Sequence, residues 1–191
     1  MATTNSSLAF MAGDERDTLY LGPAGTDLSS ITGLTTAVPA GLVDVGWISE
    51  DGMTLGLSDS VDKIRGHQDH GVVRTYMSES STTFQASLLE TKLELLKSYL
   101  GVTKAEKVTD GSGSVTKLTV KASRKVERLA GVADLYDVST GKHRRYIFPI
   151  VELGERSDIV YQNGELTVYE YNLEVIDGYT MFSDEDGLKV A

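Results

Sequence analysis

The amino-acid sequence predicts a mainly β protein, a β-sandwich or β-barrel with one flanking α-helix and a long extended hairpin. Two observations support this fold class. Apolar and polar residues alternate in several short stretches bounded by glycine, asparagine or aspartate, which is typical of antiparallel strands. Only residues 87–100 carry apolar side chains at helical spacing. A chain of strands with one amphipathic helix is expected to bury the apolar face of that helix against a sheet.

The helix is predicted from a leucine stripe in residues 87–100. Leu89, Leu93, Leu96 and Leu100 follow one another at spacings of four, three and four residues, which places them on one helical face.

Both ends of this stretch carry helix-end signals. Ser87 followed by Glu90 has the spacing of a capping box, in which the two side chains satisfy free backbone N–H groups. Gly101 stands where a helix C-terminus favours a residue that tolerates positive φ. The sequence therefore predicts a helix that begins at Ser87 and ends at Leu100.

The chain before the helix is predicted to be extended. Asp51-Gly52 favours a hairpin turn, and residues 66–71 are a polar connection between two further strands. The stretch 58–86 has few apolar residues, so a hairpin there buries little surface and is expected to pair with another chain. Trp47, the only tryptophan, is expected to be a core or interface anchor. Strands are predicted at residues 43–48, 53–57, 61–65, 72–77 and 82–86.

After the helix the pattern is again that of strands and short turns. Asn163-Gly164 is a favoured two-residue hairpin turn. Strands are predicted at residues 102–108, 115–122, 129–136, 145–151, 159–161 and 168–175. We predict three parts: an extended N-terminal arm at residues 1–40, a β-sandwich domain at 41–176, and a frayed C-terminal tail at 177–191.

Composition excludes several classes of function. The 191 residues contain no cysteine, which removes disulfide scaffolds, thiolate metal sites and cysteine nucleophiles. The formal net charge of −10 argues against a surface that grips nucleic-acid phosphates. No apolar run approaches the roughly 20 residues of a membrane-spanning helix, so no membrane partner is expected.

A metal site is the first candidate for chemistry. His67, Asp69 and His70 form an HxDH pattern in a predicted loop. A metal site needs a further ligand, and the remaining histidine, His143, lies beside two arginines that would repel a cation. A polar hairpin tip is the favoured interpretation, and no metal or cofactor is expected.

Catalytic motifs are lacking. The Ser112 region is not a GxSxG nucleophile elbow, and residues 22–26 lack the lysine of a phosphate-binding loop. Residues 142–145, KHRR, are the densest basic run. They could bind phosphate, but pairing with acidic residues of this chain or of a neighbour is at least as good an interpretation. We therefore do not expect an enzyme.

Four segments, in order along the chain, resemble one protein family. Residues 43–52, VDVGWISEDG, resemble the "lGyvsedG" signature of siphophage major tail proteins, which are tail tube proteins. Residues 22–26, GPAGT, resemble their "aPvGT" element, and residues 83–90, TFQASLLE, resemble "tfsftllE". Residues 130–137 with 144–149 resemble the late "vvdw…rrivip" hairpin. The resemblance as a whole covers about residues 20–176.

The resemblance implies a structural virion protein without catalytic residues. It implies a β-sandwich whose subunits close into hexameric rings, whose hairpins join into an inner β-barrel, and whose rings stack into a tube. The tube would enclose the tape measure protein and conduct DNA without specific binding. Tail tip and tail terminator proteins are its implied partners. The implied location is the virion tail, with assembly in the host cytoplasm.

An acidic lumen would keep DNA from sticking to such a tube. We therefore expect Asp59, Asp62 and Glu79 to face the lumen or to lie on the assembly hairpin. The alternative function is a non-catalytic β-sandwich binding module for a carbohydrate or a protein. That alternative predicts a concave aromatic patch, for which Tyr161, Tyr169 and Tyr171 are the candidates.

Overall fold

The computed structural model describes residues 4–67 and 69–190 and is mainly β, as the sequence predicts. One antiparallel sheet holds eight strands in the order β2-β1-β7-β8-β9-β4-β3, with β10 paired to β8. A separate hairpin is formed by β5 and β6. The elements are η1 (Ser6–Leu8), β1 (Thr18–Pro23), β2 (Val43–Asp44), β3 (Ile48–Arg65), β4 (Val72–Leu88), α1 (Leu93–Leu100), β5 (Val102–Asp110), β6 (Gly113–Val120), β7 (Glu127–Tyr136), β8 (His143–Arg156), β9 (Tyr169–Val175), β10 (Thr180–Ser183) and η2 (Asp186–Leu188).

Core residues cover both faces of the central strands β7 and β8. On one face, a large cluster includes Leu19 of β1, Phe84 of β4 and Leu153 of β8, and α1 closes it through Leu95 and Tyr99. On the other face, a smaller cluster packs Val132 and Ile147 against the segment between β1 and β2, through Leu28, Ile31 and Leu42. Residues of the two clusters come from the same strands, because successive side chains of a strand point to opposite faces of the sheet.

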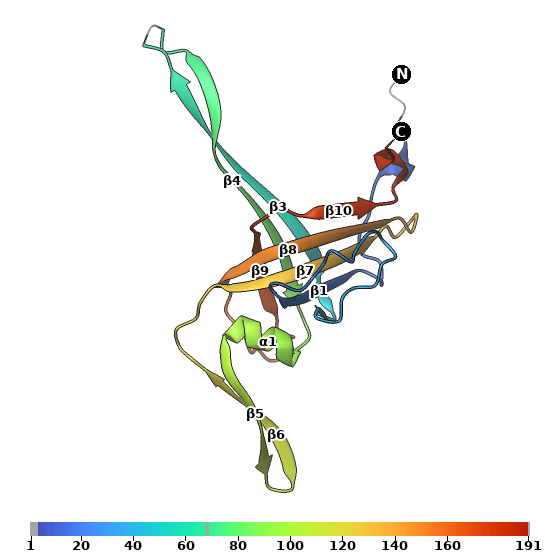
Figure 1. Ribbon diagram of the computed structural model, residues 1–191, viewed down its shortest axis with the longest axis vertical. Helices are drawn as coiled ribbons and strands as arrows, with labels where there is room; N and C mark the ends of the chain where they lie inside the picture. Colours follow the sequence, from blue (N-terminus) through green and yellow to red (C-terminus); the bar gives the residue numbers. More distant parts are fainter. Residues whose placement is uncertain (1–3, 68, 191) are drawn as a thin grey trace.

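Two hairpins extend from this body in opposite directions (Figure 1). The β3–β4 hairpin is the longer, with strands of 18 and 17 residues, and the β5–β6 hairpin follows α1. The body therefore supports two projecting ribbons whose outer parts make few contacts within the chain.

The helix is shorter than its leucine pattern predicts. It begins at Leu93, after Lys92 at the N-cap without a side-chain cap bond, so the predicted capping box is wrong. Ser87 and Leu88 instead continue β4, where they pair with Glu170 and Tyr169 of β9. Tertiary strand pairing has overridden the local helical preference. The predicted end is confirmed, since Gly101 adopts the left-handed conformation with φ of 69°.

The predicted turn at Asp51-Gly52 is also wrong. Residues 48–65 form a single strand, β3, and the turn sequence lies within it at an irregularity between the Ile48 and Met53 pairs. Gly52 has a positive φ of 71°, which an irregularity in a strand accommodates as readily as a turn does. In the same way, the strands predicted at residues 72–77 and 82–86 are one continuous strand, β4.

Most strands predicted after the helix are confirmed. Observed strands overlap the predictions at residues 102–108, 115–122, 129–136, 145–151 and 168–175. Residues 159–161 are not a strand, although Gly164 lies in a turn with φ of 82°.

The tail is not frayed throughout, because β10 pairs with β8 from Thr180 to Ser183. Strand β1 belongs to the main sheet. The division into arm, domain and tail remains a prediction.

Candidate assembly surface

The outer part of the β3–β4 hairpin leaves both of its edges unpaired among the described residues. β3 is the last strand of the sheet, and β9 pairs with β4 only from Thr83 to Leu88. From Leu57 and Thr82 outward, the two strands therefore bond only to each other. An exposed strand edge presents a row of free N–H and C=O groups, which favours pairing with another chain.

One face of this hairpin continues the apolar core outward. Met53 and Leu55 pack against the large core cluster, and the same side of β3 then presents Leu57 and Val61. Met77 pairs with Val61 and so shares its face. Leu57, Val61 and Met77 are 70%, 52% and 55% exposed, and we call the side that carries them the apolar face.

The opposite side of the hairpin, here the polar face, is built from small and acidic residues. Its paired positions are Ser58 with Ser81, Ser60 with Glu79, and Asp62 with Tyr76. Paired residues of an antiparallel ladder project to the same side, so Glu79 and Asp62 share one face. Ile64 and Arg74 follow on this face near the tip.

The three acidic residues singled out in the sequence therefore do not share a face. Asp59 lies on the apolar face, paired with Ser80, whose hydroxyl donates a hydrogen bond of 2.7 Å to the Asp59 carboxylate. Asp62 and Glu79 lie on the polar face. Alternation along a strand separates neighbours at odd spacing, and Asp59 and Asp62 are three residues apart.

At the hairpin tip the chain turns between Gly66 and Gly71, whose N–H and C=O form a 2.9 Å hydrogen bond. Asp69 and His70 both have positive φ, and the His70 carbonyl accepts a bond from Arg65. No three histidine, aspartate or glutamate side chains within residues 4–67 and 69–190 are grouped as metal ligands would be.

The side chains of the basic run at residues 142–145 all pair with acidic side chains of the same chain. Lys142 lies 3.6 Å from Asp186, and Arg144 pairs with Glu185. The remaining two side chains, His143 and Arg145, both contact Asp134, and all three are buried. Pairing within the chain, one of the interpretations that the sequence left open, is therefore present, and it attaches the C-terminal segment to β8.

The buried pair of Asp134 and Arg145 also holds the loop between β1 and β2. Arg145 donates two bonds to the Asp134 carboxylate, and its remaining nitrogen donates to the carbonyls of Thr36 at 2.6 Å and Gly33 at 3.2 Å. The Asp134 carboxylate raises the pKa of Arg145 further, which keeps the guanidinium charged.

Asp137 performs a similar task for the N-terminal segment. Its carboxylate accepts bonds from the backbone N–H of Met11 and from the N–H and hydroxyl groups of Ser139 and Thr140. These donors, the Ser139 hydroxyl first, hold the pKa of the Asp137 carboxyl well below its ordinary value. Ser139 and Thr140 are in turn fixed in the β7–β8 turn.

The aromatic residues do not form a concave binding patch. Tyr169 and Tyr171 are buried under α1, and burial raises the pKa of Tyr171 to about 12. Tyr161, by contrast, is 79% exposed and lies in the loop between β8 and β9. The predicted patch is therefore wrong. Trp47 is 75% exposed, so the predicted core role is wrong and the interface role stays a prediction.

No helix of the described residues is long and apolar enough to cross a membrane.

A comparison with curated proteins gives no match to the chain. A comparison with protein-family models matches residues 2–178 to the family described as phage tail tube protein. That match covers nearly the whole sequence and agrees with a β-rich fold carrying a long, edge-exposed hairpin. The chain therefore belongs to the phage tail tube protein family and is a non-enzymatic structural component of the virion tail.

Proposed function

We propose that this subunit closes into hexameric rings in which the β3–β4 hairpins join edge to edge as one inner β-barrel, and that the rings stack into a tube. The observation that supports this most directly is the outer hairpin, whose two edges have no partner among the described residues. Closure of a barrel between subunits would satisfy these backbone groups.

The polar face of the hairpin forms the lumen wall in this proposal. Serines, Asp62 and Glu79 gather on that face, and the chain carries a net charge of −10. An acidic, hydrogen-bonding wall repels DNA phosphates and lets DNA pass without specific binding. Asp59 lies on the other face and is therefore left out of the lumen set.

The apolar face is covered by a neighbouring subunit in the same proposal. Leu57, Val61 and Met77 are exposed in the single chain, and burial of such side chains against a partner contributes favourably to association. The tube encloses the tape measure protein during assembly in the host cytoplasm. Tail tip and tail terminator proteins bind at its two ends.

Negative-stain electron microscopy of the purified protein over a concentration series tests the assembly. Rings or tubes with a central channel are expected, with six-fold averages in end views. Compact monomers at every concentration, and again after addition of the tail-tip complex, would contradict the proposal and favour the binding-module alternative.

The orientation of the hairpin is tested by single cysteines, which are unique labels because the chain has none of its own. In assembled tubes, Glu79→Cys is expected to react with a small maleimide but not with a large polymer-linked one that enters the lumen poorly. Val61→Cys is the matched control on the apolar face and is expected to be protected from both reagents. Equal labelling of the two cysteines would overturn the proposed orientation.

A further inference from the structure

Two grooves of opposite charge lie at opposite ends of strands β1 and β7. The acidic groove, about 990 Å³, is lined by residues 12–18, Asp44, residues 46–53, Glu90 and Leu135. The basic groove, about 710 Å³, lies between α1, the base of the β5–β6 hairpin and the other end of β1 and β7. Thr18 pairs with Asp134 at the first end and Pro23 with Leu129 at the second. The six residues of β1 separate the grooves by roughly 20 Å.

The acidic groove contains carboxylates that no cation neutralises within the chain. Seven acidic residues line it, against Arg16 as the single basic one. Arg16 is already paired with Asp14. Glu15, Glu50 and Asp51 are exposed and form no ion pair within residues 4–67 and 69–190. This groove therefore has a negative charge that a partner can neutralise.

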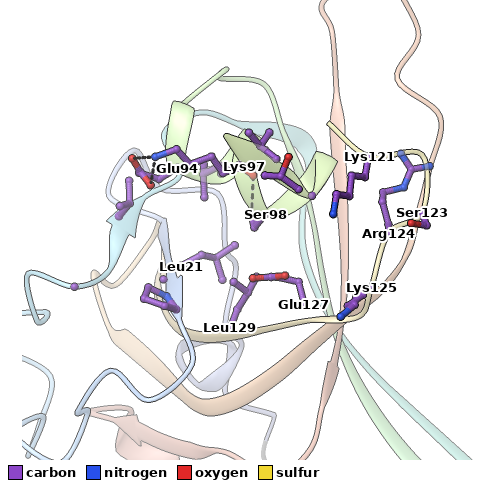
Figure 2. A pocket seen from close by; sticks show the side chains of 18 residues that line it. Leu21, Glu94, Lys97, Ser98, Lys121, Ser123, Arg124, Lys125, Glu127 and Leu129 are labelled. Atoms are coloured by element: carbon purple, nitrogen blue, oxygen red, sulfur yellow. Dashed lines mark hydrogen bonds and ion pairs between the residues drawn. The ribbon is translucent and has the colours of Figure 1, made fainter. Parts of the chain in front are cut away.

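The second groove offers the complement, because four basic residues line it against Glu94 and Glu127. Its floor is apolar, with Leu21 and Leu129 below α1, while Lys121, Arg124 and Lys125 lie along one side (Figure 2). These three cations belong to the exposed segment between β6 and β7 and form no ion pair in the described part of the chain. Lys97, by contrast, is held 2.9 Å from Glu94.

Trp47 adds an apolar anchor to the acidic groove. The Glu90 carboxylate accepts a 3.0 Å hydrogen bond from the Trp47 backbone N–H, which fixes the residue at the groove wall. The side chain is 75% exposed, an uncommon state for the largest aromatic residue. Tryptophan faces attract lysine and arginine cations and are frequent centres of protein interfaces.

We propose that the segment of residues 121–125 of one subunit docks into the acidic groove beside Trp47 of a second copy of this chain. The inference rests on the proposed tube function and assigns one of its subunit contacts. A second copy is the occupant because the same chain carries both complementary grooves. Their placement at opposite ends makes the contact head-to-tail, the kind that continues from subunit to subunit.

Electrostatics favour this contact over other encounters between copies. Each chain carries a net charge of −10, so two copies repel one another in most orientations. Docking of the basic segment into the acidic groove places unlike charges together and thereby selects one orientation. The same contact covers Trp47, which is 75% exposed in the single chain.

Charge reversal tests the pairing. The first variant is Lys121→Glu/Lys125→Glu, the second is Glu50→Lys/Asp51→Lys, and each changes the chain by four charges. Each variant alone is expected to raise the concentration needed for assembly by about tenfold or more. An equimolar mixture is expected to assemble as an alternating copolymer, because each reversed segment then meets a reversed groove. Lys107→Glu/Lys117→Glu on the β5–β6 hairpin is the matched control and is expected to assemble like the unaltered protein.

The results are distinguishable. If the unaltered protein forms no rings or tubes, the proposed function fails and this inference with it. If it assembles and both groove variants do so at the same concentration, only the inference is overturned. Variants that fail alone and also fail when mixed would overturn the pairing of these two grooves. Loss of duplex DNA binding with unchanged assembly in the first variant would make residues 121–125 a nucleic-acid surface instead.

Trp47 supplies a second readout, since it is the only tryptophan. Its emission is expected to shift to the blue when the unaltered protein assembles and to stay unshifted for each variant alone. A blue shift in the equimolar mixture supports the docking. An unshifted emission in tubes of the unaltered protein would overturn it.

Discussion

At the scale of single residues, buried charged groups attach the N-terminal segment and the loop before β2 to the sheet. Asp134 holds Arg145 and His143, and Arg145 in turn binds carbonyls of the loop before β2. Asp137 binds the N-terminal segment through Met11. Loss of one partner from a buried pair leaves the other charge without compensation, which costs far more than the pair itself contributes.

We expect Asp134→Ala to lower the free energy of unfolding by about 3–5 kcal/mol, because the buried Arg145 guanidinium loses its carboxylate. Urea unfolding followed by circular dichroism measures it. Arg128→Ala is the control, because its pair with Glu152 is mostly exposed and is worth at most about 1 kcal/mol. Equal losses for the two variants would contradict the assigned importance of the buried pair.

The acid sensitivity of the fold is expected to depend on Asp137. Its pKa is lower in the folded protein than the ordinary value of 3.8, so its contribution is complete above about pH 5. As the pH falls below 3.8 toward the folded pKa, protonation removes that contribution. Asp137→Asn should therefore flatten the acid side of the stability curve, measured by urea unfolding between pH 2 and pH 7. Parallel curves for the two proteins would contradict this prediction.

Substitution of Gly46 by alanine is expected to destabilise the fold and to displace Glu90. Gly46 has a φ of 81°, and an added Cβ would collide with the Glu90 carboxylate that binds the Trp47 N–H. Gly46→Ala should lower the free energy of unfolding by about 1–2 kcal/mol from the backbone alone, and should change the fluorescence of Trp47. Gly154→Ala is the control, because open space surrounds that position. An unchanged spectrum would show that Glu90 does not position Trp47.

At the scale of elements, the outer β3–β4 hairpin contributes to assembly more than to the fold of the single chain. We expect Leu57→Ser/Val61→Ser/Met77→Ser to change the free energy of unfolding of the monomer little, since all three side chains are exposed. The same variant should lose ring and tube formation, seen by sedimentation and electron microscopy.

The control for the apolar face is Val115→Ser/Val120→Ser on the β5–β6 hairpin, where both valines are also exposed. It should assemble normally if the effect belongs to the β3–β4 apolar face. Normal assembly of the triple-serine variant would contradict that role.

The strands of the second half of the chain could be predicted because their signals are local. Alternating apolar positions in residues 168–175, for example, indicate strand β9 without reference to other elements. Asn163-Gly164 does form a turn, but the strand predicted before it at residues 159–161 is absent. The helix start could not be predicted in the same way. Leu88 fits a helical stripe, but it is fully buried in β4 because Ile48 and Tyr169 pair with it from both sides.

The assembly hairpin could be predicted from its sparse apolar content, but its two faces could not. A face depends on register, and β4 has an irregularity between the rungs of Ser60 and Val61 that no sequence signal marks. The face of Glu79 relative to the β3 carboxylates therefore depends on a register that the sequence does not reveal, whereas the odd spacing of Asp59 and Asp62 alone places those two on opposite faces. The two grooves were also missed, since Glu15 and Glu50 are brought together only by the folded sheet.

At the scale of the whole molecule, charge is distributed to suit passage of DNA rather than its capture. We expect assembled tubes not to retain short duplex DNA in co-sedimentation at about 0.15 M salt. Asp62→Lys/Glu79→Lys should make the tubes retain it, because two acidic residues on the polar face become basic and the net charge of each subunit rises by four. Asp59→Lys on the apolar face should not. Retention by Asp59→Lys alone would mean that the faces are assigned the wrong way round.

The two strands of the long hairpin differ in length over the same interval. From the Asp59–Ser80 rung to the Arg65–Val72 rung, β3 advances six residues (65 − 59) and β4 advances eight (80 − 72). A ribbon with one longer side does not lie flat but coils toward its shorter side. Each hairpin is therefore already curved before it meets the hairpin of a neighbouring subunit. The bore of the tube would then be set largely by where two extra residues fall in one strand.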